Sequence, residues 1–561
     1  MEEQIGQDGF VEKEASPPRE NGREKGTEMQ SHEESPRSSF MSSFRWTVLC
    51  FSMLVAEIQA ALDSTITADL QPTIIDSLGE ISKFPWINVT YALGLGGSCL
   101  LWGKLLVFGS KNVLLLGRAI FAIGSVVTAA APTMNALIVG KVITGIGSSA
   151  TYISTINIIT ALTSAEERGR YFGYIGSMWG LGTIIGPLIG GAFAVSAAGW
   201  RWSFYFNLIL VALTFPPFIF LIPSSKRKRS SQSSLQLIRC LDLVGSILFS
   251  SALFTLIAAL SFAGAIHPWS SPRIIGLLCS TGILWSSLAA QQAATIFTTK
   301  EDRILPIHIL SSWEMWNLIF QMSCSISMLF ITIFYTPLYS QFVRGQSALR
   351  SAIDLLPFLL TCVTAMLVSG WLISSVGYYK LWFIAGSGLS LISFSCLYTI
   401  EVDTPYGKIY GYLILGGIGT GLYAMNAGAV MSATVAKQDA ADAATIFGCV
   451  DTICGAIAVA VANCVFVNRA TDSIQVILPE TPRHVVQQAI AGVGASLTNE
   501  ASPEVRARIL QAARDAIADV WLQLIATAAV SFVFSFLLRN KKLKPVTTEI
   551  GPVSEAAAFP L

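Results

Sequence analysis

Residues 241–265 read LDLVGSILFSSALFTLIAALSFAGA, and Asp242 is the only charged residue in this stretch. A helix needs about 20 mostly apolar residues to cross roughly 30 Å of hydrocarbon, so the stretch is long enough to span a membrane. Lipid offers the backbone no hydrogen-bond partner, which favours a helix, because its backbone hydrogen bonds are internal. The stretch therefore predicts a transmembrane helix.

Apolar runs of this kind recur along the chain from Trp46 onward, and there are fourteen of them. They predict an all-α polytopic membrane protein with 14 transmembrane helices. Their expected cores are 46–66, 86–108, 113–131, 134–162, 171–197, 203–222, 241–265, 273–295, 314–340, 351–374, 380–400, 407–432, 443–467 and 518–538.

The overall composition agrees with a membrane protein and excludes several other classes. Of the 561 residues, 53% are hydrophobic and 13% are charged, whereas a soluble domain carries roughly 25% charged residues. The net charge of +1 provides no broad field for nucleic acid. The ten cysteines and four histidines show no metal-ligand spacing, so we expect no metal. No phosphate-binding Gly-x-x-x-x-Gly-Lys-Ser/Thr motif appears, so we expect no nucleotide and no cofactor.

The loops between the predicted helices indicate the orientation of the chain. Thirteen basic residues fall in the short loops on the N-terminal side, against six on the opposite side. The positive-inside rule therefore places both termini in the cytoplasm. Residues 1–45 form a polar tail that cannot bury enough apolar surface to fold. Residues 541–561 form a second cytoplasmic tail, and 223–240 a basic cytoplasmic loop.

The longest connection, 468–517, is expected on the outer side. Its segment Pro503–Asp515 is amphipathic and predicts a helix on the membrane surface. The sequon at Asn88 faces the same side and is a candidate for glycosylation.

Charged residues inside the predicted helices are the first candidates for function, because a charge in the membrane is costly without a partner. The first helix holds Glu57 and Asp63, which lie about 240° apart around the helix, whereas Gln59 shares the face of Asp63. Asp63 is either a functional carboxylate or a group that reaches water at the end of the helix. Lys141 in the fourth helix either extends to the interface or pairs with a carboxylate on the first helix.

The fifth predicted helix is rich in glycine. Gly182, Gly186 and Gly190 are four residues apart and share one face, Pro187 interrupts the helical hydrogen bonds, and Gly191 follows. Such a stripe allows a neighbouring backbone to approach closely, and its density suggests a helix that slides or rocks. Plain packing is the alternative.

Several of these motifs together resemble one known family. Leu62-Asp63-x-Thr65-Ile66, Gly103-Lys104-Leu105, the Gly140 to Gly147 pattern, Gly186-Pro187 and Trp200-Arg201-Trp202-x-Phe204-x-x-Asn207 are similar to the major facilitator superfamily. Fourteen predicted helices, together with Tyr335-x-Pro337-Leu338-Tyr339-x-Gln341 and Pro357, resemble its fourteen-spanner drug:proton antiporter branch, in particular fungal toxin and multidrug exporters. The resemblance covers about residues 46–540.

The resemblance implies a fold of two six-helix bundles, 46–222 and 296–540, joined by two extra helices within 241–295 and alternating around a central cavity. It places Asp63 on the acidic motif that is proposed to couple protons. Lys141 stands where the family usually has Arg. Gly103 and Lys104 mark the gating loop after the second helix, where Val107 replaces the Asp of many relatives. Gly186 and Pro187 fall on a motif associated with antiporters.

Other candidate residues rest on weaker signals. Asp354 and Asp451 are further intramembrane acids that could carry the proton. Aromatic residues could bind a flat apolar solute, although core packing is the alternative for each. These cavity candidates, with Gln59, are Trp179, Tyr335, Tyr339 and Tyr423.

These observations predict a proton-coupled exporter of small apolar organic compounds, such as a fungal toxin, secondary metabolite or drug. The expected partners are a small-molecule substrate, protons and the lipid bilayer, and the expected state is a monomer in the plasma membrane. Asp63→Asn is expected to keep the fold and abolish gradient-driven transport. The alternatives are an importer or exchanger of the same fold, such as a siderophore carrier, and a non-transporting sensor. An intramembrane enzyme would need clustered His or acidic motifs that this sequence lacks.

Overall fold

The computed structural model describes residues 42–67, 70–78, 85–223, 241–264, 267–299, 302–436, 439–491 and 502–540. Within these residues 14 helical segments are long and apolar enough to cross a membrane, which confirms the predicted fold class. The tail before residue 42, the basic loop after 223 and the tail after 540 fall outside the described residues almost entirely.

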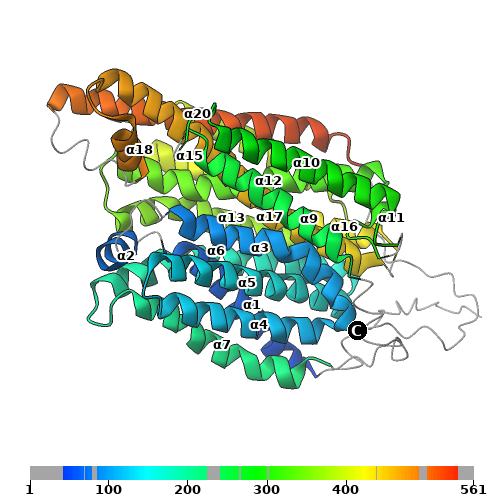
Figure 1. The fold of residues 1–561 in the computed structure, drawn as a ribbon. Helices are drawn as coiled ribbons and strands as arrows, with labels where there is room; N and C mark the ends of the chain where they lie inside the picture. Colours follow the sequence, from blue (N-terminus) through cyan, green and yellow to red (C-terminus); the bar gives the residue numbers. More distant parts are fainter. Residues whose placement is uncertain are drawn as a thin grey trace, which may run out of the picture. The chain divides into compact units, whose positions relative to one another are not determined.

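The helices of the first half of the chain run side by side in Figure 1. Four of them follow a Ser or Thr whose side chain accepts a hydrogen bond from the first turn, as Thr133 does from Ala136 N at 3.3 Å. Their bounds are α1 Ser43–Thr65, α2 Gln71–Leu78, α3 Pro85–Leu105, α4 Ser110–Ala129, α5 Met134–Leu162, α6 Ala165–Val195, α7 Arg201–Leu221, α9 Leu243–Phe262 and α10 Pro272–Ala294.

Within the described residues, the second half of the chain contains six further spanning segments and two short helices, α11 and α18. The helix α13 ends at Gly377, whose φ of 80° is the left-handed conformation that terminates many helices. The bounds are α11 Ile307–Leu310, α12 Trp313–Leu338, α13 Ala348–Val376, α14 Lys380–Tyr398, α15 Tyr406–Gly421, α16 Asn426–Thr434, α17 Ala440–Ile477, α18 Arg483–Ala491 and α20 Pro503–Ser535.

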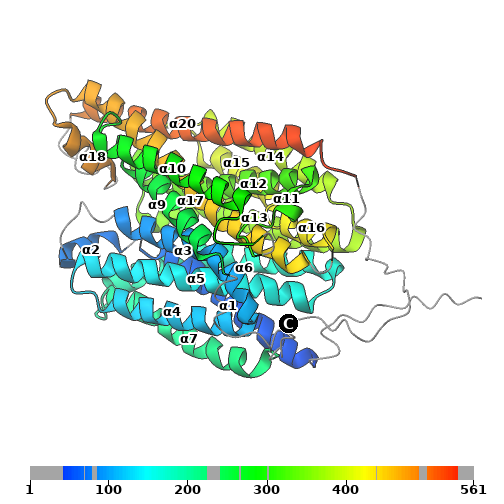
Figure 2. The same ribbon diagram turned by 45° about the vertical axis from the view of Figure 1, so that its right-hand side comes forward.

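Two predicted segments differ from the structure. The run 407–432 is not one helix, because the chain leaves the α-helix between Gly421 and Asn426 and forms α15 and α16. The connection 468–517 is largely helical, since α17 continues to Ile477 and α20 begins at Pro503. The amphipathic stretch Pro503–Asp515 is therefore helical as predicted, but it is continuous with the last spanning helix. It is held there by buried Ile509 and Ala513. The helix α18 packs against α17, and Figure 2 shows α18 at the same end of the helices as α2.

We divide the helices other than α9 and α10 into an N-terminal group, α1 to α7, and a C-terminal group, α11 to α20. In the N-terminal group α1 packs against α6 and α7, and α5 packs against α3 and α4. In the C-terminal group α17 and α20 pack against α12, and α15 packs against α13 and α14. The groups meet at two seams, α6 against α13 and α3 against α17.

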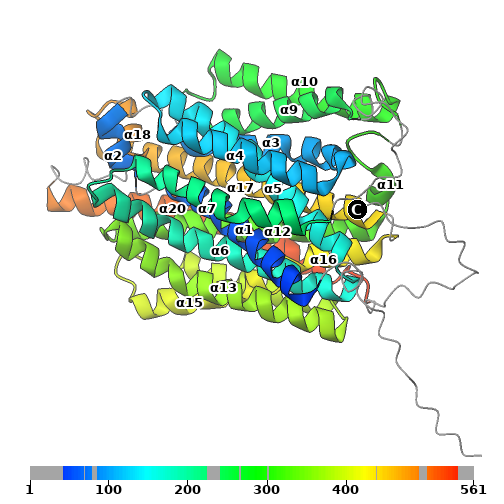
Figure 3. The same ribbon diagram turned by 90° about the horizontal axis from the view of Figure 1, so that it is seen from below.

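The extra pair α9 and α10 lies beside the second seam. The helix α9 contacts α3 of one group and α17 of the other, and Figure 3 shows α9 and α10 next to α3. We call the half of the helices nearer to Ser42 and Asn540, where α1 begins and α20 ends, the terminal half.

Candidate functional site

A buried ion pair joins α1 to α5. The Nζ atom of Lys141 lies 3.0 Å from Oδ2 of Asp63, and each side chain is 1% exposed. Lys141 also donates to the backbone oxygen of Asp63 at 2.8 Å, and its Nζ lies 4.9 Å from the centre of the Phe204 ring. Lys141 therefore does not extend to the interface, and the alternative of pairing with a carboxylate on the first helix is confirmed.

The ion pair continues into a polar network within the N-terminal group. Asn207 of α7 donates to Oδ1 of Asp63 at 2.9 Å, and its backbone oxygen accepts from Gln59 Nε2 at 2.6 Å. The shared face of Gln59 and Asp63 is thereby confirmed. Arg118 of α4 donates to Gln59 Oε1 at 2.5 Å and to Thr214 Oγ1 at 2.9 Å.

Arg118 is the residue that the sequence analysis missed. It is 1% exposed and sits in the middle of the apolar run 113–131, so the intramembrane-charge argument applied to Lys141 could have found it. Its fork geometry allows one guanidinium to hold α1 and α7 together. We call the set Asp63, Lys141, Asn207, Gln59 and Arg118 the Asp63 network.

Two further carboxyl groups, those of Glu57 and Asp451, lie near this network. Glu57 is 1% exposed, and Arg118 and Asp451 are both near enough to influence its charge. Thr155 faces Glu57, but Thr155 Oγ1 and Glu57 Oε1 each lack a hydrogen bond of normal geometry to any described residue. Asp451 of α17 accepts a hydrogen bond from the Tyr152 hydroxyl of α5 at 2.8 Å, so this carboxylate connects the two helix groups.

The glycines of α6 serve two different contacts. Gly182, Gly186 and Gly190 face α1, where a Cβ atom on Gly190 would lie 2.8 Å from Ile66 O. They are therefore packing positions inside the N-terminal group. No atom lies within 4 Å of a Cβ on Gly191, and Pro187 lies within α6.

Earlier glycines of α6 line the seam between the groups. A Cβ on Gly173 would lie 2.9 Å from Met366 O of α13, and one on Gly169 would lie 3.0 Å from Gly370 O. Nearby, Arg168 Nη1 donates to Ser432 O at 3.0 Å. These contacts close the terminal half of the seam.

Gly103 and Lys104 lie in the last turn of α3 and not in a loop. A Cβ on Gly103 would collide with Thr445 of α17, and Lys104 is within electrostatic reach of Asp442. An acidic residue from the other group therefore faces Lys104.

The other candidates are distributed over separate places. Asp354 accepts from Tyr410 at 2.7 Å and lies 3.5 Å from Arg350. The remaining cavity candidates are not brought together. Three of them pack against other aromatic rings, with distances between ring centres of 4.9 Å for Trp179 and Phe330, 5.8 Å for Tyr335 and Phe466, and 5.5 Å for Tyr339 and Trp521. The hydroxyl oxygen of Tyr423 lies 3.1 Å from Ser531 Oγ. Asn88 lies in α3, but its side chain is outside the described residues.

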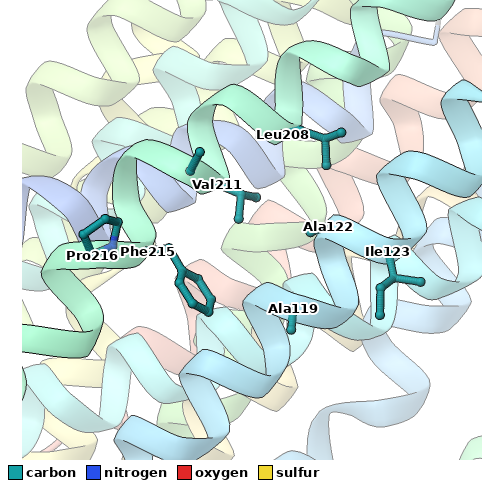
Figure 4. Close-up of a pocket in the computed structure, with 8 residues that line it drawn as sticks. Ala119, Ala122, Ile123, Leu208, Val211, Phe215 and Pro216 are labelled. Atoms are coloured by element: carbon teal, nitrogen blue, oxygen red, sulfur yellow. The ribbon is translucent and has the colours of Figure 1, made fainter.

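An apolar groove of about 500 Å³ lies between α4 and α7 (Figure 4). None of the candidate residues lines it. Ile123, which lines the groove, and the nearby Ile209 and Leu213 are more than half exposed, as expected of a surface that faces lipid. Its lining residues are Ala119, Ala122, Ile123, Leu208, Val211, Ala212, Phe215 and Pro216. The groove provides no polar group that could orient a substrate.

Comparisons with known proteins agree with this architecture. A family model described as Major Facilitator Superfamily matches residues 39–459. The chain is 34% identical to the MFS-type transporter pgmG of Aspergillus terreus, covering 92% of each chain. It is 35% identical to the efflux pump alnA of Emericella nidulans, covering 91% of this chain and 92% of that one. The human organic anion transporter MFSD10 has a similar fold, with a TM-score of 0.53 and 15% identity over 86% of this chain and 99% of that chain.

Proposed function

The chain belongs to the major facilitator superfamily of membrane transporters, and from this premise we propose that it exports small apolar organic molecules in exchange for protons. Its relatives include proteins named efflux pumps, which supports export. The substrate class that we propose is a fungal secondary metabolite, toxin or drug. The protein is a transporter without enzymatic activity, works as a monomer in the plasma membrane, and has both termini in the cytoplasm.

The observation that carries the proton-coupling proposal is the set of buried carboxyl groups at the centre of the fold. Glu57 and Asp63 are at most 1% exposed, and Asp451 lies at the contact between the helix groups. A carboxyl group in such a place either has a partner or holds a proton, and its charge responds when the surroundings change. Carboxyl groups that alternate between hydrated and buried surroundings can couple proton flow to conformational change.

The experiment that tests export compares cells with the gene deleted, restored and overexpressed, using untargeted metabolite profiles of cells and medium. We expect one family of apolar compounds to accumulate inside the deletion strain and to leave the cell when the gene is restored. Loss of a solute from the medium that depends on the gene would instead establish an importer.

Proton coupling is tested on the same compound in inside-out membrane vesicles. We expect uptake into vesicles with an acidic interior and loss of uptake when an ionophore abolishes the pH gradient. Uptake that is equal with and without the gradient would refute proton coupling but leave export intact.

A further inference from the structure

We propose that Glu57 and Asp451 form a carboxyl pair across the contact between the two helix groups, that the pair holds one proton while the terminal half is closed, and that this proton is released when the groups separate there. The inference rests on the proposed proton-coupled export and names the groups that would perform the coupling. It assigns the coupling proton to Glu57 and Asp451, whereas the family resemblance had placed Asp63 on the proton-coupling motif.

Asp63 is poorly suited to carry the proton in this conformation. Both of its carboxyl oxygens have partners, Oδ2 with Lys141 at 3.0 Å and Oδ1 with Asn207 at 2.9 Å. A proton on Asp63 would leave the ammonium group of Lys141 buried without its counter-ion, which is strongly unfavourable. Neither carboxyl oxygen of Asp63 is therefore without a partner in this conformation.

Glu57 has the opposite surroundings. No Lys or Arg nitrogen of the described residues lies within ion-pair distance of its carboxyl group. Its Oε1 also lacks a hydrogen bond within the described part of the chain. The nearby cation, Arg118, already donates to Gln59 and Thr214. A buried carboxyl group that receives so little compensation favours the neutral form.

Asp451 brings a second carboxyl group into the same region from the other helix group. Its Oδ2 accepts from Tyr152 at 2.8 Å, while its Oδ1 has no hydrogen bond among the described residues. Tyr152 is within electrostatic reach of both Asp451 and Glu57. Two like charges in a buried site oppose each other, so one proton shared by the pair is the favoured state.

Few other charged groups act on this pair. Tyr91 is within electrostatic reach of Glu57, whereas α6 from Tyr171 onward and α7 from Trp202 onward contain no charged residue. Near Asp451, Cys454 is the titratable neighbour on α17, and Lys104 acts on Asp442 instead. The helix α9 has no charged residue, and α12 has none after Glu314.

Separation of the groups at the terminal half would change both members of the pair. The helix α17 would move away from α5, the Tyr152 to Asp451 hydrogen bond would break, and water would reach both carboxyl groups. The O–H bond of the protonated carboxyl group then breaks, the carboxylate keeps the electron pair, and a water molecule accepts the proton. If one proton leaves for each opening, the ratio of open to closed molecules rises about tenfold per pH unit.

The test measures this opening without a substrate. Asn112 and Ser375 are exposed at the terminal ends of α4 and α13, one in each helix group. Spin labels at Asn112→Cys and Ser375→Cys, in a background without other accessible thiols, report the separation by double electron–electron resonance in nanodiscs. We expect the population with the longer distance to increase as the pH is raised.

Three variants identify the responsible groups. Glu57→Gln removes the like-charge opposition and leaves a neutral amide, so we expect the protein to stay closed at high pH and to lose the pH response. Asp451→Asn also removes the opposition but leaves Glu57 to titrate alone, so we expect a weaker pH response. The matched control is Asp354→Asn, a third intramembrane acid with its own partners Tyr410 and Arg350, which keeps the wild-type response. A Glu57→Gln variant that opens with the wild-type pH dependence would overturn the proposal, and so would a wild-type protein that shows no pH dependence.

A second measurement on the wild-type protein covers the case in which the variants do not fold. Infrared difference spectra between low and high pH are expected to show the loss of one protonated carboxyl band per molecule, in step with the change in label distance. A band that does not follow the distance change would refute the shared proton. Failure of the vesicle assay alone would refute proton-coupled export and leave the pH-dependent pair in place, so the two failures are distinguishable.

Discussion

Lys141→Met is the perturbation that tests the Asp63 network most directly. The pair has an Nζ to Oδ2 distance of 3.0 Å, and both side chains are 1% exposed. At an effective dielectric constant of about 20, two unit charges at this distance attract by roughly 5–6 kcal/mol. Removal of one partner from a buried pair costs about 3–5 kcal/mol, because the other charge remains buried without compensation. We therefore expect Lys141→Met to lower the free energy of unfolding by that amount.

A double variant separates the charge from the packing. Asp63→Asn with Lys141→Met removes both charges and keeps an oxygen at position 63 that can accept from Asn207. Replacement of a buried pair by neutral groups is often close to neutral, so the double variant should recover most of the stability. Single variants and the double variant are compared by reversible unfolding in mixed micelles, with tryptophan fluorescence as the signal.

The control for this prediction is Arg483→Met. Arg483 pairs with Asp472 at 2.7 Å, and the two side chains are 50% and 61% exposed; such exposed pairs contribute about 0–1 kcal/mol. A loss below about 1 kcal/mol for Lys141→Met, or a double variant as unstable as Lys141→Met alone, would refute the account of the ion pair. We also expect the double variant to keep gradient-driven export, because we propose Glu57 and Asp451 as the carriers of the proton.

Three further variants test the seams and the extra helices. Gly173→Val places atoms against the backbone of Met366, where even a Cβ would lie 2.9 Å from the carbonyl oxygen, so we expect it to hold the terminal half open in the spin-label assay. Gly276→Val on α10 is the control, because no atom lies within 4 Å of a Cβ at that position, and we expect it to leave the label distance unchanged. The thiols of Cys99 and Cys449 are neighbours across the α3 and α17 seam. Oxidation by copper phenanthroline should therefore cross-link the helix groups and stop export, reduction should restore it, and Cys99→Ser should be insensitive. Asp242 accepts four hydrogen bonds at 2.7–3.0 Å, from Gly245 N, Gln291, Gln292 and Ile304 N. Asp242→Asn turns one acceptor oxygen into a donor, so we expect it to lower the free energy of unfolding by about 1–3 kcal/mol. An unchanged unfolding curve would contradict this.

Much of the fold could be predicted from local patterns. The number of spanning segments and their approximate positions depend on hydrophobic length alone, because lipid requires each segment to satisfy its own backbone. The helical break between Gly421 and Asn426 and the continuity of α20 through Asp515 could not be predicted in this way. Both depend on packing against neighbouring helices, which the length of an apolar run does not describe.

The candidate site was predictable in its members but not in its pairings. Asp63, Glu57, Lys141 and Asp451 stand out in sequence because a charge inside an apolar run is rare and costly. Arg118 follows the same rule and was missed. The glycine pattern of α6 showed close packing, yet only the contacts reveal that Gly182 and Gly186 face α1 inside one group and that Gly173 faces the other group.

The membrane class, the fourteen spanning segments and the residues that carry buried charge follow from the amino-acid sequence alone, because hydrophobic length and the cost of charge in lipid act on each segment separately. Only the tertiary structure decided that Lys141 pairs with Asp63, that Arg118 joins α1 to α7, and that Asp451 crosses between the helix groups to meet Tyr152. These contacts join residues from 59 to 299 positions apart. Their partners are set by how the helices pack against one another, and helix packing is a property of the whole bundle.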